Sequence, residues 1–206
     1  MCVALLAAVP ASATTYNWNF TSPTGTLGTS QVYTSNGVNI TAYGYKFTDS
    51  NCGKSGHPAC TATALYGKNA GGDEVGIGIA NDPKGDNEIS NTDFVQLKLT
   101  DLIATNPADI EMAIGSVQAG ETWTIYGSNS QGVRGTALLS GSTDYPSNFD
   151  ITKYVGTGAG QYSYISVSGP SGDVLVSHVG TTPEPASFLL LGSGILATWR
   201  MRKRKA

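Results

Sequence analysis

Acidic side chains gather in one stretch of the chain that glycine and proline bend. Asp73 comes first, and Asp82, Asp86 and Glu88 follow within a segment of sequence Asn-Asp-Pro-Lys-Gly-Asp-Asn-Glu. Ca²⁺ binds about six to eight oxygen atoms from carboxylates, amides and backbone carbonyls, and a bent acidic loop supplies several at once. The residue types therefore predict a calcium site at these four carboxylates. The spacing is not that of an EF-hand, so a set of solvated surface charges is the alternative.

The same carboxylates could act as a general acid and base on a polysaccharide. A pair such as Asp82 with Glu88, or Asp86 with Glu88, would have to flank the glycosidic bond at a separation that the mechanism sets. Motifs of other catalytic sites are missing: beside His57 and His178 there is no Gly-x-Ser-x-Gly element, and no glycine-rich segment has phosphate-loop spacing. We therefore expect a protein that is not an enzyme, with a polysaccharide hydrolase as the alternative.

Two cysteines, Cys52 and Cys60, bracket a polar loop of seven residues. In an exported chain this arrangement predicts a local disulfide. Closing so short a loop would stabilise the fold by about 2–3 kcal/mol. A metal site that adds His57 to both cysteines is the alternative, and it lacks a fourth ligand at a recognisable spacing.

Short apolar runs separated by turn-forming residues fill the chain between residues 14 and 182. No window has ten residues of helical periodicity, whereas runs of five to eight residues are rich in β-branched and aromatic side chains. These runs predict strands near 16–21, 31–36, 38–48, 61–67, 74–80, 93–100, 109–117, 121–128, 134–140, 147–153, 161–168 and 173–179.

Alternation within the runs indicates how the strands pack. In the segment 95–100, Val95, Leu97 and Leu99 point one way, and the polar residues, Gln96 among them, point the other way towards solvent. Turn signals recur every eight to fifteen residues, and no internal repeat is present. We therefore expect an all-β fold, an antiparallel two-sheet β-sandwich of jelly-roll type.

One segment adds a resemblance to this fold. The order Trp-Thr-Ile-Tyr-Gly-Ser-Asn at residues 123–129, followed by a turn and a leucine-bearing strand, resembles part of discoidin-like or galactose-binding-like jelly rolls. In those folds, loop aromatics bind sugars because a flat ring covers the apolar face of a pyranose. The resemblance implies ligand binding by Tyr145 and Tyr154, with Tyr162 and Tyr43 as further candidates. For each ring alone, core packing is the alternative.

The N-terminal residues 1–13 have the pattern of a secretory signal peptide. An apolar run over residues 3–9 precedes Ala11-Ser12-Ala13, a small-x-small cleavage pattern. No Lys or Arg comes before the run, which indicates that the signal peptide is truncated at its start. A buried element of the folded body is the alternative.

The C-terminal residues 183–206 have three parts in order. Pro183-Glu184-Pro185 precedes an uncharged stretch over 186–199, and a basic cluster ends the chain, with Arg200, Arg202, Lys203, Arg204 and Lys205. The stretch is shorter than the about 17–25 residues of a usual span, although arginine side chains reaching to the interface extend it. We expect a membrane helix over 186–199, with the basic cluster in the cytoplasm and the body outside.

These three parts at a C-terminus resemble the PEP-CTERM sorting signal. The resemblance implies recognition by an exosortase, a membrane-embedded enzyme similar to cysteine transpeptidases. It also implies a Gram-negative host that makes exopolysaccharide. An ordinary C-terminal membrane anchor is the alternative.

The net charge of residues 14–182 bears on the function of the body. Residues 14–182 carry fourteen acidic and seven basic side chains, a net charge near −7, which argues against a nucleic-acid binder. We expect a precursor that the Sec machinery exports, that the tail tethers to the inner membrane and that exosortase sorts to the envelope or extracellular matrix. Its body would bind or structure exopolysaccharide, with Ca²⁺ as its expected cofactor. A structural surface protein without a specific ligand is a further alternative.

Overall fold

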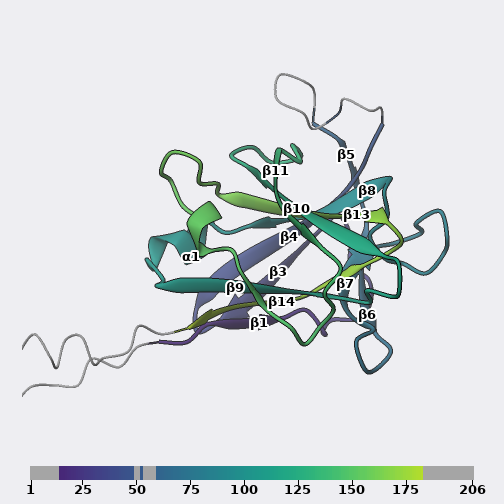
Figure 1. Cartoon of the computed structure of the whole chain (residues 1–206), viewed down its shortest axis with the longest axis horizontal. Helices are drawn as coiled ribbons and strands as arrows, with labels where there is room; N and C mark the ends of the chain where they lie inside the picture. The colour runs from purple at the N-terminus through teal and green to yellow at the C-terminus, as the bar shows by residue number, and fades with distance from the viewer. Residues whose placement is uncertain (1–13, 49–51, 53–58, 183–206) are drawn as a thin grey trace, which may run out of the picture. The chain divides into compact units, whose positions relative to one another are not determined.

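Residues 16–182 form a β-sandwich of two antiparallel sheets (Figure 1). The computed structural model describes residues 14–48, 52 and 59–182. Among these residues, sheet A contains β1 (Asn17–Asn19), β2 (Gly25–Thr26), β6 (Leu65–Asn69), β7 (Val75–Ile79), β9 (Asp109–Gly115), β12 (Phe149–Asp150) and β14 (Leu175–Thr182). Sheet B contains β3 (Ser30–Ser35), β4 (Val38–Lys46), β5 (Thr61–Thr63), β8 (Asp93–Lys98), β10 (Thr122–Ser128), β11 (Thr136–Gly141) and β13 (Tyr164–Ser171).

The chain passes repeatedly from one sheet to the other. Sheet A has the order β12-β9-β14-β7-β6-β2, and sheet B has the order β11-β10-β13-β8-β4-β3. In sequence, β7 leads into β8, β9 into β10 and β13 into β14. Strands that are neighbours in one sheet are therefore continued by strands that are neighbours in the other, which is a winding of the jelly-roll kind. The predicted all-β sandwich is confirmed.

Apolar side chains from both sheets fill the space between them. Ile40, Leu97 and Val167 point inwards from sheet B, and Ile77 and Met112 belong to the same core cluster from sheet A. All five are fully buried. Since each such side chain contributes about 1.5–3 kcal/mol when removed from water, this shared core is what holds the sheets face to face.

The central strand β7, of sequence Val-Gly-Ile-Gly-Ile, is buried at every position. Its isoleucines enter the core, and its glycines allow other backbone segments to lie against the strand. A Cβ atom at Gly78 would lie 2.3 Å from the carbonyl oxygen of Asn87, and one at Gly76 would lie 2.4 Å from that of Val176. Glycine is therefore required where the segment that joins β7 to β8 folds back over β7.

The predicted strands agree with most of the observed ones in place, but the range 61–67 joins β5 and β6, which belong to different sheets, and β2 was not predicted. Each predicted range overlaps an observed strand. The range 93–100 is too long, because β8 ends at Lys98 and a short helix, α1 (Thr100–Ala104), follows. The range 147–153 contains β12 and a 3₁₀ turn, η1 (Thr152–Tyr154). Helical elements of five and three residues are too short to produce a periodic pattern, so the sequence did not reveal them.

The expectation that Gln96 faces solvent is wrong. Its side chain is fully buried, because the loop between β10 and β11 covers the outer face of sheet B at this point. The amide nitrogen of Gln96 donates to the carbonyl of Val133 at 2.9 Å, and its amide oxygen accepts from the backbone N–H of Gly132 at 2.8 Å. A polar residue at an outward position can thus serve as the anchor of a covering loop.

The last strand, β14, lies in the interior of sheet A. It pairs with β9 along its length, from Leu175 opposite Gly115 to Thr182 opposite Asp109, and on its other side with β7 and β1. All strands found among the described residues precede residue 183. The core and both sheets are therefore formed by residues that precede the C-terminal segment.

Removing residues 183–206 should leave the stability of the body unchanged. We expect the melting temperature to shift by less than about 2 °C, since no strand is lost. Thermal unfolding followed by circular dichroism, with the full chain in detergent as reference, measures this. Ending the chain before Leu175 is the control, because it deletes β14 from the interior of sheet A and should prevent folding. A large loss of stability in the first variant would show that the body depends on its tail.

Candidate functional site

The connection between β7 and β8 contains the acidic turn, residues 81–88. The buried carboxylate of Asp82 accepts backbone N–H hydrogen bonds from Lys84 and Gly85, each at 3.0 Å, and from Asn87 at 2.8 Å. Asn81 and Asn87 have φ values of 52° and 65°, a region that asparagine tolerates better than most residues. Local hydrogen bonding by Asp and Asn thus folds the turn.

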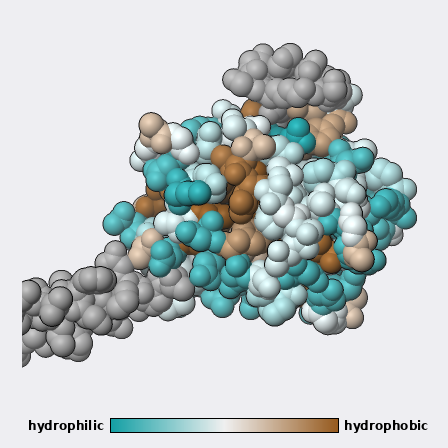
Figure 2. Space-filling model, in the orientation of Figure 1, coloured by the Kyte–Doolittle hydropathy of each residue, from teal (hydrophilic) through white to brown (hydrophobic). Residues whose placement is uncertain are grey.

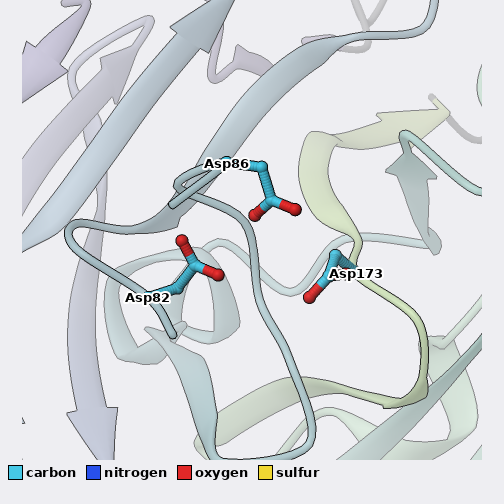
Figure 3. A group of neighbouring side chains, drawn as sticks. All are labelled: Asp82, Asp86 and Asp173. Carbon is cyan, nitrogen blue, oxygen red and sulfur yellow. The ribbon is translucent and has the colours of Figure 1, made fainter. Parts of the chain in front are cut away.

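Three aspartates meet at this turn. Asp82 and Asp86 come from the turn itself, and Asp173 comes from the connection between β13 and β14. One carboxylate oxygen of each lies within 4.8 Å of the others, and Figure 3 shows the three side chains turned towards a common space. The two connections are joined by backbone hydrogen bonds between Ile89 and Val174, at 2.8 and 3.1 Å. We call these three residues the aspartate cluster.

The surroundings of the cluster are partly charged and partly unsatisfied. The Lys84 ammonium group forms an ion pair with Oδ2 of Asp173, and the Glu121 carboxylate accepts the backbone N–H of Asp173 at 3.2 Å. Oδ1 of Asp173 is buried and has no hydrogen-bond partner among the described residues. Burial raises the pKa of Asp86, and the negative charges of Asp173 and Asp82 raise it further.

Two of the four predicted calcium ligands lie elsewhere. Glu88 is in contact with Lys68 and Ser116, and Asp73 lies beside Asp144, whose pKa is raised by burial and by the neighbouring Asp73. The structure therefore brings Asp82 and Asp86 together, without Asp73 or Glu88. Sequence reasoning missed Asp173, which lies far along the chain, and a single Gly-Asp turn before a strand is too common a signal to have found it.

Glu88 belongs to a buried ion-pair group. The Lys68 ammonium group pairs with both Glu74 and Glu88, and the Ser116 hydroxyl oxygen lies 2.8 Å from Oε1 of Glu74 and 2.9 Å from Oε1 of Glu88. The Glu88 side chain is only 5% exposed. Burial raises the pKa of Glu88 to about 7, whereas the hydrogen bond from Lys68 lowers the pKa of Glu74. One hydroxyl proton cannot serve two carboxylates at once, so the group favours a proton on Glu88.

The two tyrosines predicted to bind ligand lie in different settings. The Tyr154 hydroxyl donates to the carbonyl of Leu138 at 3.2 Å, and its ring packs on the core with the Lys153 ammonium group 4.8 Å from the ring centre. Tyr145 is half-buried, and its backbone N–H donates to the carbonyl of Ile114 at 2.7 Å. Ligand binding by either ring stays a prediction.

A second group of tyrosines lies on the outer face of sheet B. Tyr43 on β4 and Tyr164 on β13 are half-buried, and both lie near Tyr45. Lys98 on β8 pairs directly with Tyr164 and is a diagonal neighbour of Tyr43, since it pairs with Thr41. We call Tyr43, Lys98 and Tyr164 the tyrosine face. Tyr43 was among the candidates from sequence, whereas Tyr164 was not.

One face of the body has hydrophobic residues gathered at its middle with hydrophilic residues around them (Figure 2).

A cavity of about 290 Å³ lies near α1 and η1. Its walls include the apolar side chains of Ile103, Ile110 and Val155 and the polar side chains of Asn106, Thr152 and Gln161. No acid, histidine or lysine lines it, so this cavity offers no group for proton transfer at neutral pH.

The disulfide expected between Cys52 and Cys60 is present, with the two Cα atoms 5.0 Å apart. Both cysteines are buried and pack with Tyr45 and Phe94 in a small cluster on the outside of sheet B. The alternative metal site would use His57, which lies outside the described residues. The disulfide therefore closes the connection between β4 and β5, and its cysteines pack on aromatic residues of β4 and β8.

Comparison with known proteins identifies the C-terminal segment. A family model described as the PEP-CTERM protein-sorting motif matches residues 181–205. The chain carries a PEP-CTERM motif. The match confirms the resemblance seen in the sequence and implies an exported protein that exosortase processes and that is anchored transiently in the membrane. No curated protein and no solved structure matches the chain, so the discoidin-like resemblance of residues 123–129 has no further support.

The PEP-CTERM motif begins in the last residues of β14 and contains all the predicted sorting residues. These are Pro183, Glu184, Pro185, Arg200, Arg202, Lys203, Arg204 and Lys205. They lie outside the described residues, as do the expected helix over 186–199 and the signal peptide over 1–13. Within the part of the chain that the structure describes, no helix has the length and apolar character needed to cross a membrane.

Glu88 should make stability depend on pH. Its folded pKa, about 7, lies above its ordinary value, so its contribution to stability is complete below about pH 4.5 and is lost as the pH rises through 7. Glu88→Gln should remove this part of the decline between pH 5 and 8. Urea unfolding of both proteins across that range measures the difference between their free energies of unfolding. Burial lowers the pKa of His178, which changes stability in the opposite direction, but this effect is the same in both proteins and cancels in the difference.

Two further variants separate the ion-pair group from general charge effects. Lys68→Met should cost about 3 kcal/mol at pH 8, because it leaves Glu74 and Glu88 facing each other without a cation. Asp101→Asn, at an exposed acid of α1, should leave the pH profile unchanged. If the profile of Glu88→Gln parallels that of the unmodified chain, Glu88 is ionised throughout and the assignment is wrong.

Proposed function

We propose that the chain is an exported protein of the envelope or extracellular matrix of a Gram-negative bacterium, whose β-sandwich body binds or structures exopolysaccharide without catalysing a reaction. The observation that carries this proposal is the PEP-CTERM motif at residues 181–205. The resemblance of the tail to PEP-CTERM sorting signals implies a host that produces exopolysaccharide. The body must then function outside the cell.

The proposed route has three steps. The Sec machinery exports the precursor through its N-terminal signal peptide, and the apolar stretch over 186–199 holds it in the inner membrane with the basic cluster inside. Exosortase then recognises Pro183-Glu184-Pro185. Prolines on both sides of Glu184 cannot continue a helix, so this tripeptide suits an extended recognition segment directly after β14.

The tyrosine face supports polysaccharide as the ligand. Tyr43 and Tyr164 present ring surface on a rigid sheet, with the Lys98 side chain between their strands. Aromatic rings pack against the apolar faces of sugar rings, and an ammonium group pairs with the carboxylates of acidic polysaccharides. A sheet face of this kind accepts an extended polymer better than the small cavity near α1 does.

Several observations favour a body without catalytic activity over a hydrolase. Of the carboxylates predicted as catalytic pairs, Glu88 is ion-paired with Lys68, and Asp82 is hydrogen-bonded within the acidic turn. Glu88 and Asp82 are each about 95% buried, which leaves no access for a glycoside. Retaining hydrolases need an accessible pair about 5–5.5 Å apart.

Replacing Pro183-Glu184-Pro185 by three alanines should leave export intact and block processing. The intact mass of the protein recovered from the host should then include the C-terminal segment, whereas the unmodified protein should lose a segment that begins near Pro183 or Ala186. The substitution should not disturb the folding of the body, since the three residues follow β14. Unchanged processing of the variant would refute recognition of the tripeptide.

Substituting the tyrosine face should weaken polysaccharide binding. We expect Tyr43→Ala and Tyr164→Ala each to raise the dissociation constant for the host's purified exopolysaccharide about tenfold, which corresponds to about 1.4 kcal/mol. Affinity electrophoresis through gels that contain the polymer measures this. Tyr66→Ala, at a half-buried tyrosine of β6 in sheet A, is the control and should bind normally.

Each other outcome of this experiment selects an alternative. If the unmodified protein does not bind the polymer, the protein is a structural surface protein without this ligand. If the polymer becomes shorter during incubation, the protein is a hydrolase. Equal weakening by Tyr66→Ala would move the binding surface away from sheet B.

A further inference from the structure

The aspartate cluster joins two connections that are distant in sequence. Asp82 and Asp86 lie between β7 and β8, and Asp173 lies between β13 and β14. One oxygen from each residue lies within 4.8 Å of the other two, and the side chains are turned towards one another (Figure 3). An ion placed between these oxygens would therefore contact both connections at once.

A buried oxygen without a partner points to a ligand at this place. Asp173 is 4% exposed, and its Oδ1 accepts no hydrogen bond from any described residue. A buried carboxylate oxygen that lacks a partner costs free energy, because it has lost its water and gained nothing in exchange. A bound cation would satisfy it.

The other two carboxylates also have free capacity. Asp82 accepts two N–H groups through Oδ1 and one through Oδ2, which leaves one lone pair on Oδ2. Asp86 accepts the N–H of Glu88 through Oδ1 at 3.2 Å, and its carboxylate faces that of Asp82. The turn thus holds its carboxylates in place with some of their lone pairs and leaves others for a ligand.

The net charge of the group is negative even with Lys84 in place, so it attracts a cation. Three carboxylates and the Lys84 ammonium group give a formal charge of −2 within the group. Lys84 pairs with Asp173 although its own side chain is 57% exposed, so it can move into solvent at little cost. Glu121, which accepts the backbone N–H of Asp173, adds a fourth carboxylate nearby.

We propose that Asp82, Asp86 and Asp173 bind Ca²⁺, and that Lys84 is an internal cation which calcium displaces from Asp173. The donor set is oxygen only, which selects a hard cation over zinc or copper. Calcium fits better than magnesium because it accepts irregular arrangements of carboxylates and water. With three carboxylates and a competing lysine, the dissociation constant should lie at about 10⁻⁴–10⁻³ M, as in extracellular modules.

The site has a structural consequence for the body. Calcium would link the β7–β8 connection to the β13–β14 connection. It would so hold together the ends of the four central strands that these connections join. Protons compete for the same oxygens, so binding should weaken as the pH falls. This inference does not depend on polysaccharide binding.

Calcium titration of the full chain in detergent tests the site. Isothermal titration calorimetry with CaCl₂ should give one binding event, and 10 mM CaCl₂ should raise the melting temperature by several degrees at low ionic strength. Asp86→Asn and Asp173→Asn should each weaken binding at least tenfold. Asp101→Asn, which removes an exposed acid on α1, is the control and should bind calcium as the unmodified chain does.

Lys84→Met distinguishes a cation site from a turn that is merely acidic. Without calcium, this variant should melt at a lower temperature, because Asp173 loses its ammonium partner and the negative charges of Asp82 and Asp86 nearby are no longer offset. With calcium, it should bind about tenfold more tightly than the unmodified chain, because the competitor is gone. A purely structural Lys84 would give the loss of stability without the gain in affinity, and that result would overturn the proposal.

The remaining outcomes are also decisive. Binding of MgCl₂ as tight as that of CaCl₂ would overturn the choice of ion, and a response to calcium that Asp101→Asn reduces equally would indicate general charge screening. If Asp173→Asn fails to fold, Asp86→Asn and Lys84→Met still test the site, since Asp86 is half-buried and Lys84 is exposed, whereas Asp173 is buried.

Discussion

The positions of the carboxylates in the acidic turn depend on one steric condition, the close approach of this turn to β7 at Gly78. The carbonyl oxygen of Asn87 and the Cα atom of Glu88 lie where any larger residue at position 78 would place its side chain. This contact lets the turn fold back over sheet A instead of projecting into solvent. It therefore sets the position of Glu88, and through the turn also that of Asp82 and Asp86.

From this position the turn distributes its carboxylates between two environments. Glu88 enters the buried group of Lys68, Glu74 and Ser116, where a lysine already balances the charge. Asp86, two residues earlier, belongs instead to the aspartate cluster. The two groups differ in how far their buried charges are balanced. The first group is satisfied internally, and one proton on Glu88 completes it, whereas the second retains a buried oxygen without a partner and an exposed lysine.

The body completes its last described strand where the sorting segment begins along the chain. The body closes its core with β14, an interior strand that β9, β7 and β1 secure by hydrogen bonds. The PEP-CTERM motif begins as that strand ends. A processing enzyme can therefore act on the segment after residue 182 without disturbing a buried strand, which is what a transiently anchored protein requires of its fold.

The sequence alone determined the local features of this protein: the strands, the disulfide between Cys52 and Cys60, and the three-part tail. Each of these depends on neighbouring residues, on the two-residue period of a strand or on short spacing, so it can be found without a fold. Only the tertiary structure decided which polar residues meet. It joined Asp173 to Asp82 and Asp86, separated Glu88 from them and buried Gln96 under a loop. The physical reason is that strands distant in sequence become neighbours only when both sheets bury a common core, and no local pattern encodes that pairing.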